Sequence, residues 1–89
     1  MALNIEKLRD GLASLTGMDL ENAEAQERDK GNSAIDISFS RSFQARLAAK
    51  ALEMKLPEFK ALPAKDYSLA SREVFRFLFT VSDEEESDD

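Results

Sequence analysis

The stretch Pro63–Phe79, PAKDYSLASREVFRFLF, has the spacing of an amphipathic helix. Apolar residues recur in it at steps of three and four, and one helical face therefore carries Tyr67, Ala70, Val74, Phe77 and Leu78. Phe75 and Phe79 widen this face. Aromatic side chains bury about 150–250 Å² each, so we expect this helix to anchor the core together with Phe43 and Phe59. These phenylalanines are either core residues or a partner surface, and no polar constellation of a ligand pocket accompanies them.

Two helices are expected before residue 31. The first has apolar residues at Ile5, Leu8, Leu12 and Leu15, a cap at Asn4 and a stop at Thr16–Gly17. Gly11 lies inside it and weakens it by about 1 kcal/mol relative to alanine. The second, Asp19–Lys30, is almost entirely polar, with Asp19 as a possible cap. We expect it to be loosely held and to be followed by a loop at 31–33.

The segment 34–39 alternates apolar Ile35, Ile37 and Phe39 with polar residues, as a half-buried strand does. One strand cannot form a sheet alone. The segment would therefore lie along a helix, pair with the edge of a partner, or form a hairpin with a stretch interpreted as helical. Its open edges could also recruit a second copy of the chain.

A central helix is expected from about Ser42 to Met54, capped by Ser40 or Ser42, and its alanines permit close packing. Pro57 favours a short helical turn at 57–61, and Pro63 opens the last helix. The predicted fold is therefore mainly α, with three to five helices and one extended segment near 34–39. Residues 1–80 form a single helical domain and 81–89 a disordered acidic tail.

Charge is distributed unevenly along the 89 residues, whose formal net charge is −6. Residues 1–40 carry four basic and eight acidic side chains, 41–80 carry eight and four, and 81–89 carry six acidic ones. Six like charges with little to bury predict an extended, solvated end. This tail is either a solubilising end or a segment that covers the basic middle or competes there with an acidic partner.

Composition excludes several classes of protein. The sequence has no cysteine and no histidine, which removes thiolate metal sites, disulfides and imidazole catalysis. Its three glycines are scattered, so a phosphate loop is not expected. Asp66 is better explained as a carboxylate at a helix start than as a catalytic group. We therefore expect no enzyme, no catalytic residue, no cofactor and no metal.

The cellular location is inferred from two further features of the sequence. The longest stretch without a charged residue, Gly11–Met18, is far shorter than the roughly 20 residues of a membrane span. The first residues also lack the pattern of a secretory signal. The expected location is the cytoplasm, without membrane contact.

Basic residues are spread along the middle of the chain, which makes nucleic-acid binding an alternative function. They come at steps of four or five, at Arg41, Arg46, Lys50, Lys55, Lys60 and Lys65. A helix-turn-helix could be placed on Phe43–Val74, but its turn at 53–55 has no glycine and the acidic tail opposes phosphate. The alternatives that stay open are a small regulatory protein of this kind and an inhibitor that acts by acidic surface mimicry.

Residues 35–79 resemble the small tail assembly chaperones of long-tailed bacteriophages. The resemblance rests on the apolar segment IDISF (35–39), the helix ARLAAKAL (45–52), the stretch LPEFKALPAKDY (56–67) and the ending VFRFLF (74–79). The family often has a glycine near Glu53–Met54, where this sequence has none.

The resemblance implies a non-enzymatic protein that coats the phage tape measure protein and recruits tail tube subunits during virion morphogenesis. It would act in the host cytoplasm, and such families often make a longer product by ribosomal frameshifting. The expected partner contacts are the extended segment and the aromatic face of the last helix, with a homo-oligomer possible through the same surfaces. The candidate binding residues are Ile35, Ile37, Phe39, Phe59, Tyr67, Phe75 and Phe79.

Overall fold

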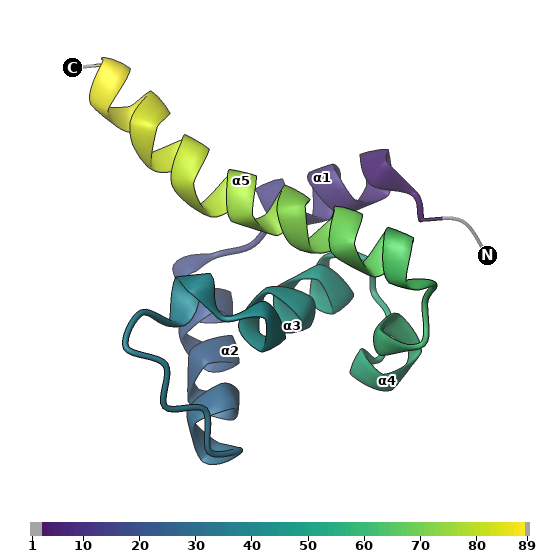
Figure 1. Cartoon of the computed structure of the whole chain (residues 1–89). Coiled ribbons are helices and arrows are strands. Elements are labelled where there is room, and N and C mark those ends of the chain that lie inside the picture. Colours follow the sequence, from purple (N-terminus) through teal and green to yellow (C-terminus); the bar gives the residue numbers. More distant parts are fainter. Residues whose placement is uncertain (1–2, 89) are drawn as a thin grey trace.

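The computed structural model describes residues 3–88, with side chains placed through Phe79. It contains five α-helices and one 3₁₀ turn, and no strand occurs within 3–88 (Figure 1). The elements are α1 (Ile5–Ala13), α2 (Gly17–Asp29), η1 (Ile37–Phe39), α3 (Arg41–Ala51), α4 (Leu56–Lys60) and α5 (Ala64–Asp88). The mainly α prediction is confirmed. The predicted disordered tail, 81–89, falls beyond the last described side chain.

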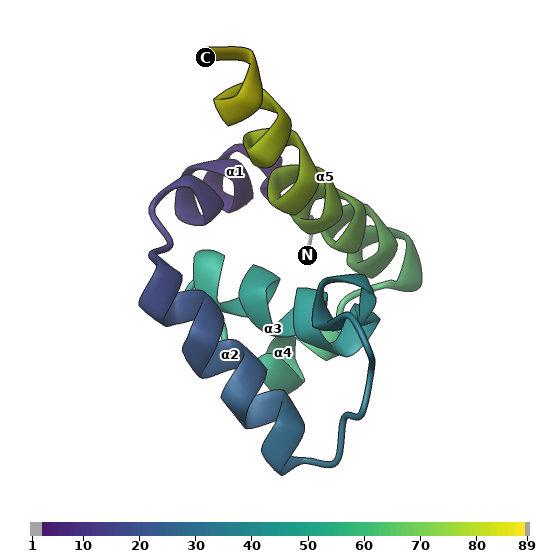
Figure 2. The ribbon, with the colours of Figure 1, turned by 90° about the vertical axis from the view of Figure 1, so that its left-hand side faces the viewer.

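Helix α3 forms the centre of the molecule. It contacts α1, α2, α4, α5 and η1, and Figure 2 shows α1 and α5 lying together on one side of it. Seven of its eleven residues are buried, among them Phe43 and Leu47. Four of the seven are alanines, whose small side chains let neighbouring helices approach closely. The core thus forms around a helix that is enclosed on most sides.

Most of the large residues predicted for the core are buried or half-buried in the structure. Phe43 and Phe59 are buried, as expected, and Ala70 and Val74 are buried hydrophobic residues of α5. Tyr67, Phe77 and Leu78 are half-buried against the same core. The helical face predicted for Pro63–Phe79 therefore packs inward as expected.

Capping residues set where the helices begin. Asn4 accepts a hydrogen bond from the Lys7 N–H at the start of α1, and Ser40 does the same for the Phe43 N–H at the start of α3. Ser40, rather than Ser42, is thus the cap of α3. Helix α2 begins earlier than predicted: Thr16 is its cap, and Asp19 completes a capping box from the third helical position.

The strand interpretation of 34–39 is wrong. Asp36 accepts a hydrogen bond from the Ser38 N–H at 3.0 Å, and the Ser40 N–H bonds to the Ile37 carbonyl at 2.9 Å. A short polar side chain thereby offers the backbone an alternative to a strand ladder. A 3₁₀ turn follows an irregular loop, and of the three alternating apolar residues only Ile37 is buried.

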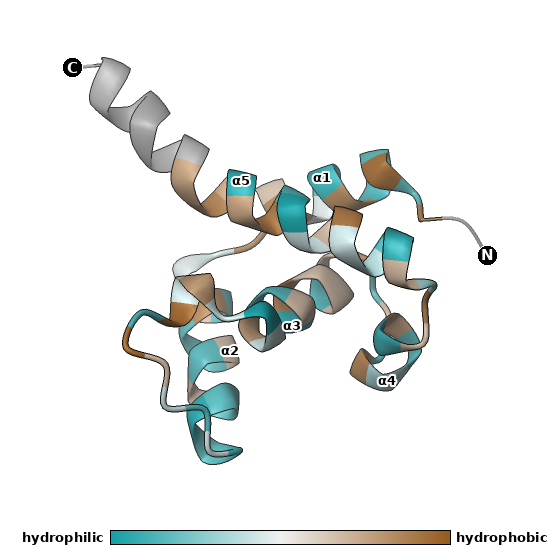
Figure 3. Ribbon diagram, viewed as in Figure 1, coloured by the Kyte–Doolittle hydropathy of each residue, from teal (hydrophilic) through white to brown (hydrophobic). Residues whose placement is uncertain are grey.

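Helix α2 packs on the core through ion pairs as well as through Ala23 and the partly buried Leu20. Ala23 and Glu27 are its only buried residues, and Figure 3 shows the helix as largely hydrophilic. The Glu27 carboxylate lies 2.7 Å from the Arg46 guanidinium, which is itself mostly covered. A polar helix therefore gains a fixed position through a buried ion pair, which its sequence did not predict.

The turn after α3 adopts a backbone conformation that usually needs glycine. Glu53 has φ of +58°, with Met54 N–H bonded to the Ala49 carbonyl at 2.9 Å and Glu53 N–H to the Lys50 carbonyl at 3.1 Å. This is a Schellman motif with glutamate at the left-handed position. The turn at the end of α2 uses Gly31 for the same purpose, with φ of +95°.

Candidate functional site

Three phenylalanines from two elements gather at the surface, and we call them the aromatic cluster: Phe39 of η1 with Phe75 and Phe79 of α5. The ring centroid of Phe39 lies 5.8 Å from that of Phe75 and 5.2 Å from that of Phe79. Phe75 and Phe79 lie 4.6 Å apart. These distances are typical of favourable aromatic pairs.

A buried glutamine positions η1 against α5. The Gln44 side-chain amide donates a hydrogen bond to the Ser38 carbonyl at 2.8 Å, and its oxygen accepts one from the Ser71 hydroxyl at 2.7 Å. Gln44 therefore ties the 3₁₀ turn and α5 to α3 at one point. The two hydrogen bonds hold the turn that carries Phe39 against the helix that carries Phe75. The sequence did not predict this link, and its only signal was a polar residue on the buried face of the predicted 42–54 helix.

The aromatic cluster is exposed to an extent unusual for phenylalanine. Phe39 exposes 61% of its surface and Phe75 40%, although both rings are in contact with other aromatic rings. Isolated exposed apolar residues are ordinary, whereas a contiguous patch indicates an interaction surface. The cluster can cover apolar side chains of a partner.

The candidate residues separate into an accessible group and a core group. Phe39, Phe75 and Phe79 are brought together as the aromatic cluster, and Ile35 is fully exposed in the loop before η1. Phe59 and Ile37 are buried, so their proposed partner contacts are corrected to core packing. They are apolar residues that helix packing covers first. Tyr67 is half-buried with its ring 5.3 Å from that of Phe59, which makes it part of the core edge.

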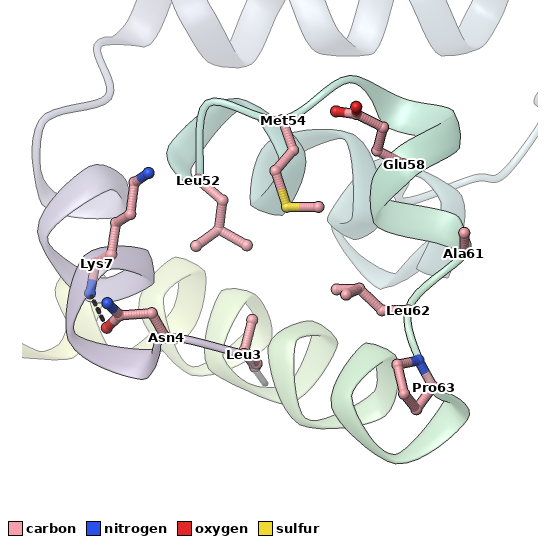
Figure 4. Close-up of a pocket in the computed structure, with 9 residues that line it drawn as sticks. All are labelled: Leu3, Asn4, Lys7, Leu52, Met54, Glu58, Ala61, Leu62 and Pro63. Atoms are coloured by element: carbon pink, nitrogen blue, oxygen red, sulfur yellow. Dashed lines mark hydrogen bonds between the residues drawn. The ribbon is translucent and has the colours of Figure 1, made fainter. Parts of the chain in front are cut away.

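A second surface feature is an apolar groove of about 550 Å³, which no single sequence pattern indicated. Figure 4 shows Leu52, Met54 and Leu62 converging on it from the end of α3 and the α4–α5 turn, with Lys7 and Glu58 at its edges. Because its residues come from distant parts of the chain, only the tertiary fold assembles it. The groove can hold an apolar side chain.

Carboxylates with shifted pKa values are all engaged in structural pairs. Burial raises the pKa of Glu27, but hydrogen bonds from Asn32, Arg46 and Ser42 outweigh burial and lower it below its ordinary value. The hydrogen bond from Arg9 lowers the pKa of Glu73, against the opposing effect of burial. Each shift is explained by a partner that holds two helices together. Neither requires a catalytic role.

Asp19 and two basic residues of the middle segment are also engaged in structural pairs. The backbone N–H of Thr16 lowers the pKa of the Asp19 carboxyl. Asp19 also lies 3.6 Å from Lys50, while Arg46 pairs with Glu27. Two of the six basic residues on which the nucleic-acid alternative rests are therefore paired with acidic residues of α2. This pairing weakens a phosphate-binding interpretation.

Among the described residues, no group of three acidic side chains has the arrangement of a metal site. None of the helices there combines the length and apolar character needed to span a membrane. No protein-family model matches the chain, and neither the curated proteins nor the solved structures contain a match.

Proposed function

We propose that this protein is a non-enzymatic tail assembly chaperone of a long-tailed bacteriophage. The aromatic cluster is the observation that supports it best, because Phe39 and Phe75 remain exposed beside a core that already holds Phe43 and Phe59. All three residues of the cluster fall within the segment 35–79 that carries the family resemblance. The cluster supports a partner site on this protein.

The proposed partner is the tape measure protein. A long helical protein with apolar stripes aggregates unless those stripes are covered, and an aromatic patch can cover one by accepting its i, i+3, i+4 side chains. Arg72 and Arg76 are exposed on α5 beside Phe75, so the patch has a basic edge. It would favour stripes flanked by acidic residues.

Tail tube subunits complete the proposed set of partners. Binding them would bring the tube protein to the coated tape measure protein, in the cytoplasm of the infected host. This part of the proposal rests on the family resemblance, and no residue of the chain is assigned to it.

The test is co-expression with overlapping fragments of a candidate tape measure protein. We expect the wild-type chain to raise the soluble yield of some fragments, and the Phe39→Ser/Phe75→Ser variant to lose this effect. Met18→Ser is the matched control, since Met18 is a 65% exposed apolar residue at the start of α2, away from the cluster. Thermal unfolding of both variants shows whether each is folded.

Two outcomes would overturn the proposal. One is failure to solubilise any fragment along the whole tape measure protein. The other is a folded Phe39→Ser/Phe75→Ser variant that works as well as the wild type. A gene position between a tail tube gene and a very long gene would support the proposal, and a position beside repressor or defence genes would count against it.

A further inference from the structure

Helices α2 and α4 both pack on α3 and leave a groove between them, which we call the α2–α4 groove. It consists of two adjoining cavities of about 370 and 650 Å³ that share Arg46 of α3 and Leu56 of α4. The α2 side of the groove runs from Asp19 to Lys30. At about 1.5 Å per residue this length is about 17 Å, which matches five residues of extended chain at about 3.3 Å each.

The two walls of the groove differ in chemistry. The α2 wall carries the exposed amides of Asn22 and Gln26, which are four residues apart. Side chains with this spacing lie about 5–6 Å apart, close to the roughly 6.6 Å between alternate residues of an extended peptide. The Gln26 oxygen accepts a hydrogen bond from Arg46 at 3.1 Å, and its NH₂ group can donate to a peptide carbonyl. The α4 wall is apolar and is formed by Leu56 and Pro57.

The charges that line the groove are unbalanced. Both of its acidic residues are engaged, in the pairs Glu27–Arg46 at 2.7 Å and Asp19–Lys50 at 3.6 Å. Lys30 and Lys60 line one end and are exposed, and no ion pair among the described side chains includes either. Figures 1 and 2 place this end of α2 away from the C-terminal end of α5. The two lysines therefore favour a negatively charged group at this end of the groove.

We propose that the α2–α4 groove binds an extended peptide segment of a partner, in which an apolar and an acidic residue are two positions apart. The apolar side chain lies on Leu56 and the acidic one between Lys30 and Lys60. The amides of Asn22 and Gln26 bond to the peptide backbone, as in other modes of extended-peptide recognition. Leu56 and Lys60 are four residues apart, which suits side chains two residues apart on one face of an extended chain.

This site gives a role to the polar composition of α2, whose residues at steps of four offer hydrogen-bonding groups to the groove. The interaction is expected to be weak, with a dissociation constant of about 0.1–1 mM, because its charged residues are exposed to solvent. The α2–α4 groove shares no residue with the aromatic cluster. The inference therefore does not rest on the proposed function.

Binding of five-residue peptides with blocked termini to the full chain tests the proposal. The probe is SLSES, and its controls are SLSQS, which lacks the carboxylate, and SASES, which lacks the large apolar side chain. In ¹H–¹⁵N NMR titrations, SLSES should shift the side-chain amide resonances of Asn22 and Gln26 saturably, and each control should bind about fivefold more weakly. No shift at about 10 mM SLSES, shifts confined to the aromatic cluster, or equal binding of SLSES and either control overturns the proposal.

Variants at exposed positions locate the site. Lys30→Gln/Lys60→Gln should weaken binding of SLSES about fivefold, and Asn22→Ala about threefold. Arg41→Gln/Lys65→Gln removes the same charge from exposed positions outside the groove and should change binding less than about twofold. Thermal unfolding shows whether each variant is folded.

Two results with folded variants would overturn the groove assignment. One is unchanged binding of SLSES by Lys30→Gln/Lys60→Gln, and the other is equal weakening by Arg41→Gln/Lys65→Gln, which would indicate a general effect of charge. A chain that solubilises tape measure fragments without binding SLSES would overturn this inference alone. A chain that binds SLSES but solubilises no fragment would overturn the proposed function alone.

Discussion

The backbone of Gly11 in α1 lies directly against the carbonyl group of Ala51 in α3. A Cβ atom at Gly11 would lie 2.1 Å from the Ala51 oxygen and 2.7 Å from its carbonyl carbon. These are backbone atoms, so they cannot rotate away as the end of a side chain could. The glycine that weakens the helical propensity of α1 is therefore the residue that lets α1 reach α3.

Gly11→Ala is expected to destabilise the protein by about 3 kcal/mol, the upper end of the usual range for overpacking. Helix propensity alone predicts the opposite, a gain of about 1 kcal/mol. Denaturant unfolding decides between them. Gly17→Ala is the control, since its Cβ would meet nothing within 4 Å; it should be neutral or slightly stabilising. Equal effects of the two substitutions would contradict the packing explanation.

Glu53→Gly is expected to stabilise the protein by about 1 kcal/mol, because glycine relieves the left-handed backbone at the end of α3. The lost contact with Lys7 is a 3.9 Å pair between exposed side chains and contributes little. Gly31→Ala, at the equivalent turn after α2, should cost a similar amount. Midpoints of thermal unfolding would show the opposite signs, and a loss of stability in Glu53→Gly would contradict the prediction.

Arg46→Leu should cost about 3 kcal/mol, because it leaves the Glu27 carboxylate covered without its ion-pair partner. The Glu27 side chain is only 3% exposed. Replacing both residues, as Glu27→Leu/Arg46→Leu, should recover much of this loss. Urea unfolding of both variants measures the difference. A double variant as unstable as the single one would show that the pair itself, not the unpaired charge, determines stability.

Acid is expected to destabilise the protein through Glu27 and Glu73. Both have a lowered pKa in the folded state, so their contribution is complete above the unfolded value of about 4.3 and is lost as the pH falls through the folded pKa. Stability should thus be level near neutrality and decline below about pH 4.5. Glu73→Gln and Glu27→Gln should each flatten the decline, and an unchanged slope in both variants would contradict this assignment.

Gln44→Leu is expected to detach η1 from α5, since it removes the hydrogen bonds to Ser38 and Ser71. The free energy of unfolding should fall by about 1–3 kcal/mol, as for a buried polar group left unpaired. The ring resonances of Phe39 in NMR spectra should also move toward their free values. Ser38→Ala, which keeps the backbone carbonyl that accepts this bond, is the matched control and should leave those resonances in place.

The sequence predicts the helices of this protein better than it predicts their contacts. Periodicity and capping residues locate α1, α3, α4 and α5 because these signals are local. The strand expected at 34–39 was wrong because the Asp36 side chain bonds to a nearby backbone N–H, which competes with the alternating pattern. The contact of Phe39 with Phe75 and the hydrogen bond between Gln44 and Ser71 could not be predicted, because each joins residues at least 27 positions apart in the sequence.

The small buried surface of α2 is expected to give the molecule two levels of cooperativity. Because α2 packs on the core with only Ala23, the partly buried Leu20 and the Glu27–Arg46 pair, it can separate while α1, α3 and α5 keep their shared apolar core. Such partial opening costs less free energy than complete unfolding. Backbone amides of α2 will therefore exchange with solvent through a salt-sensitive local opening, whereas those of α3 will exchange only when the whole chain unfolds.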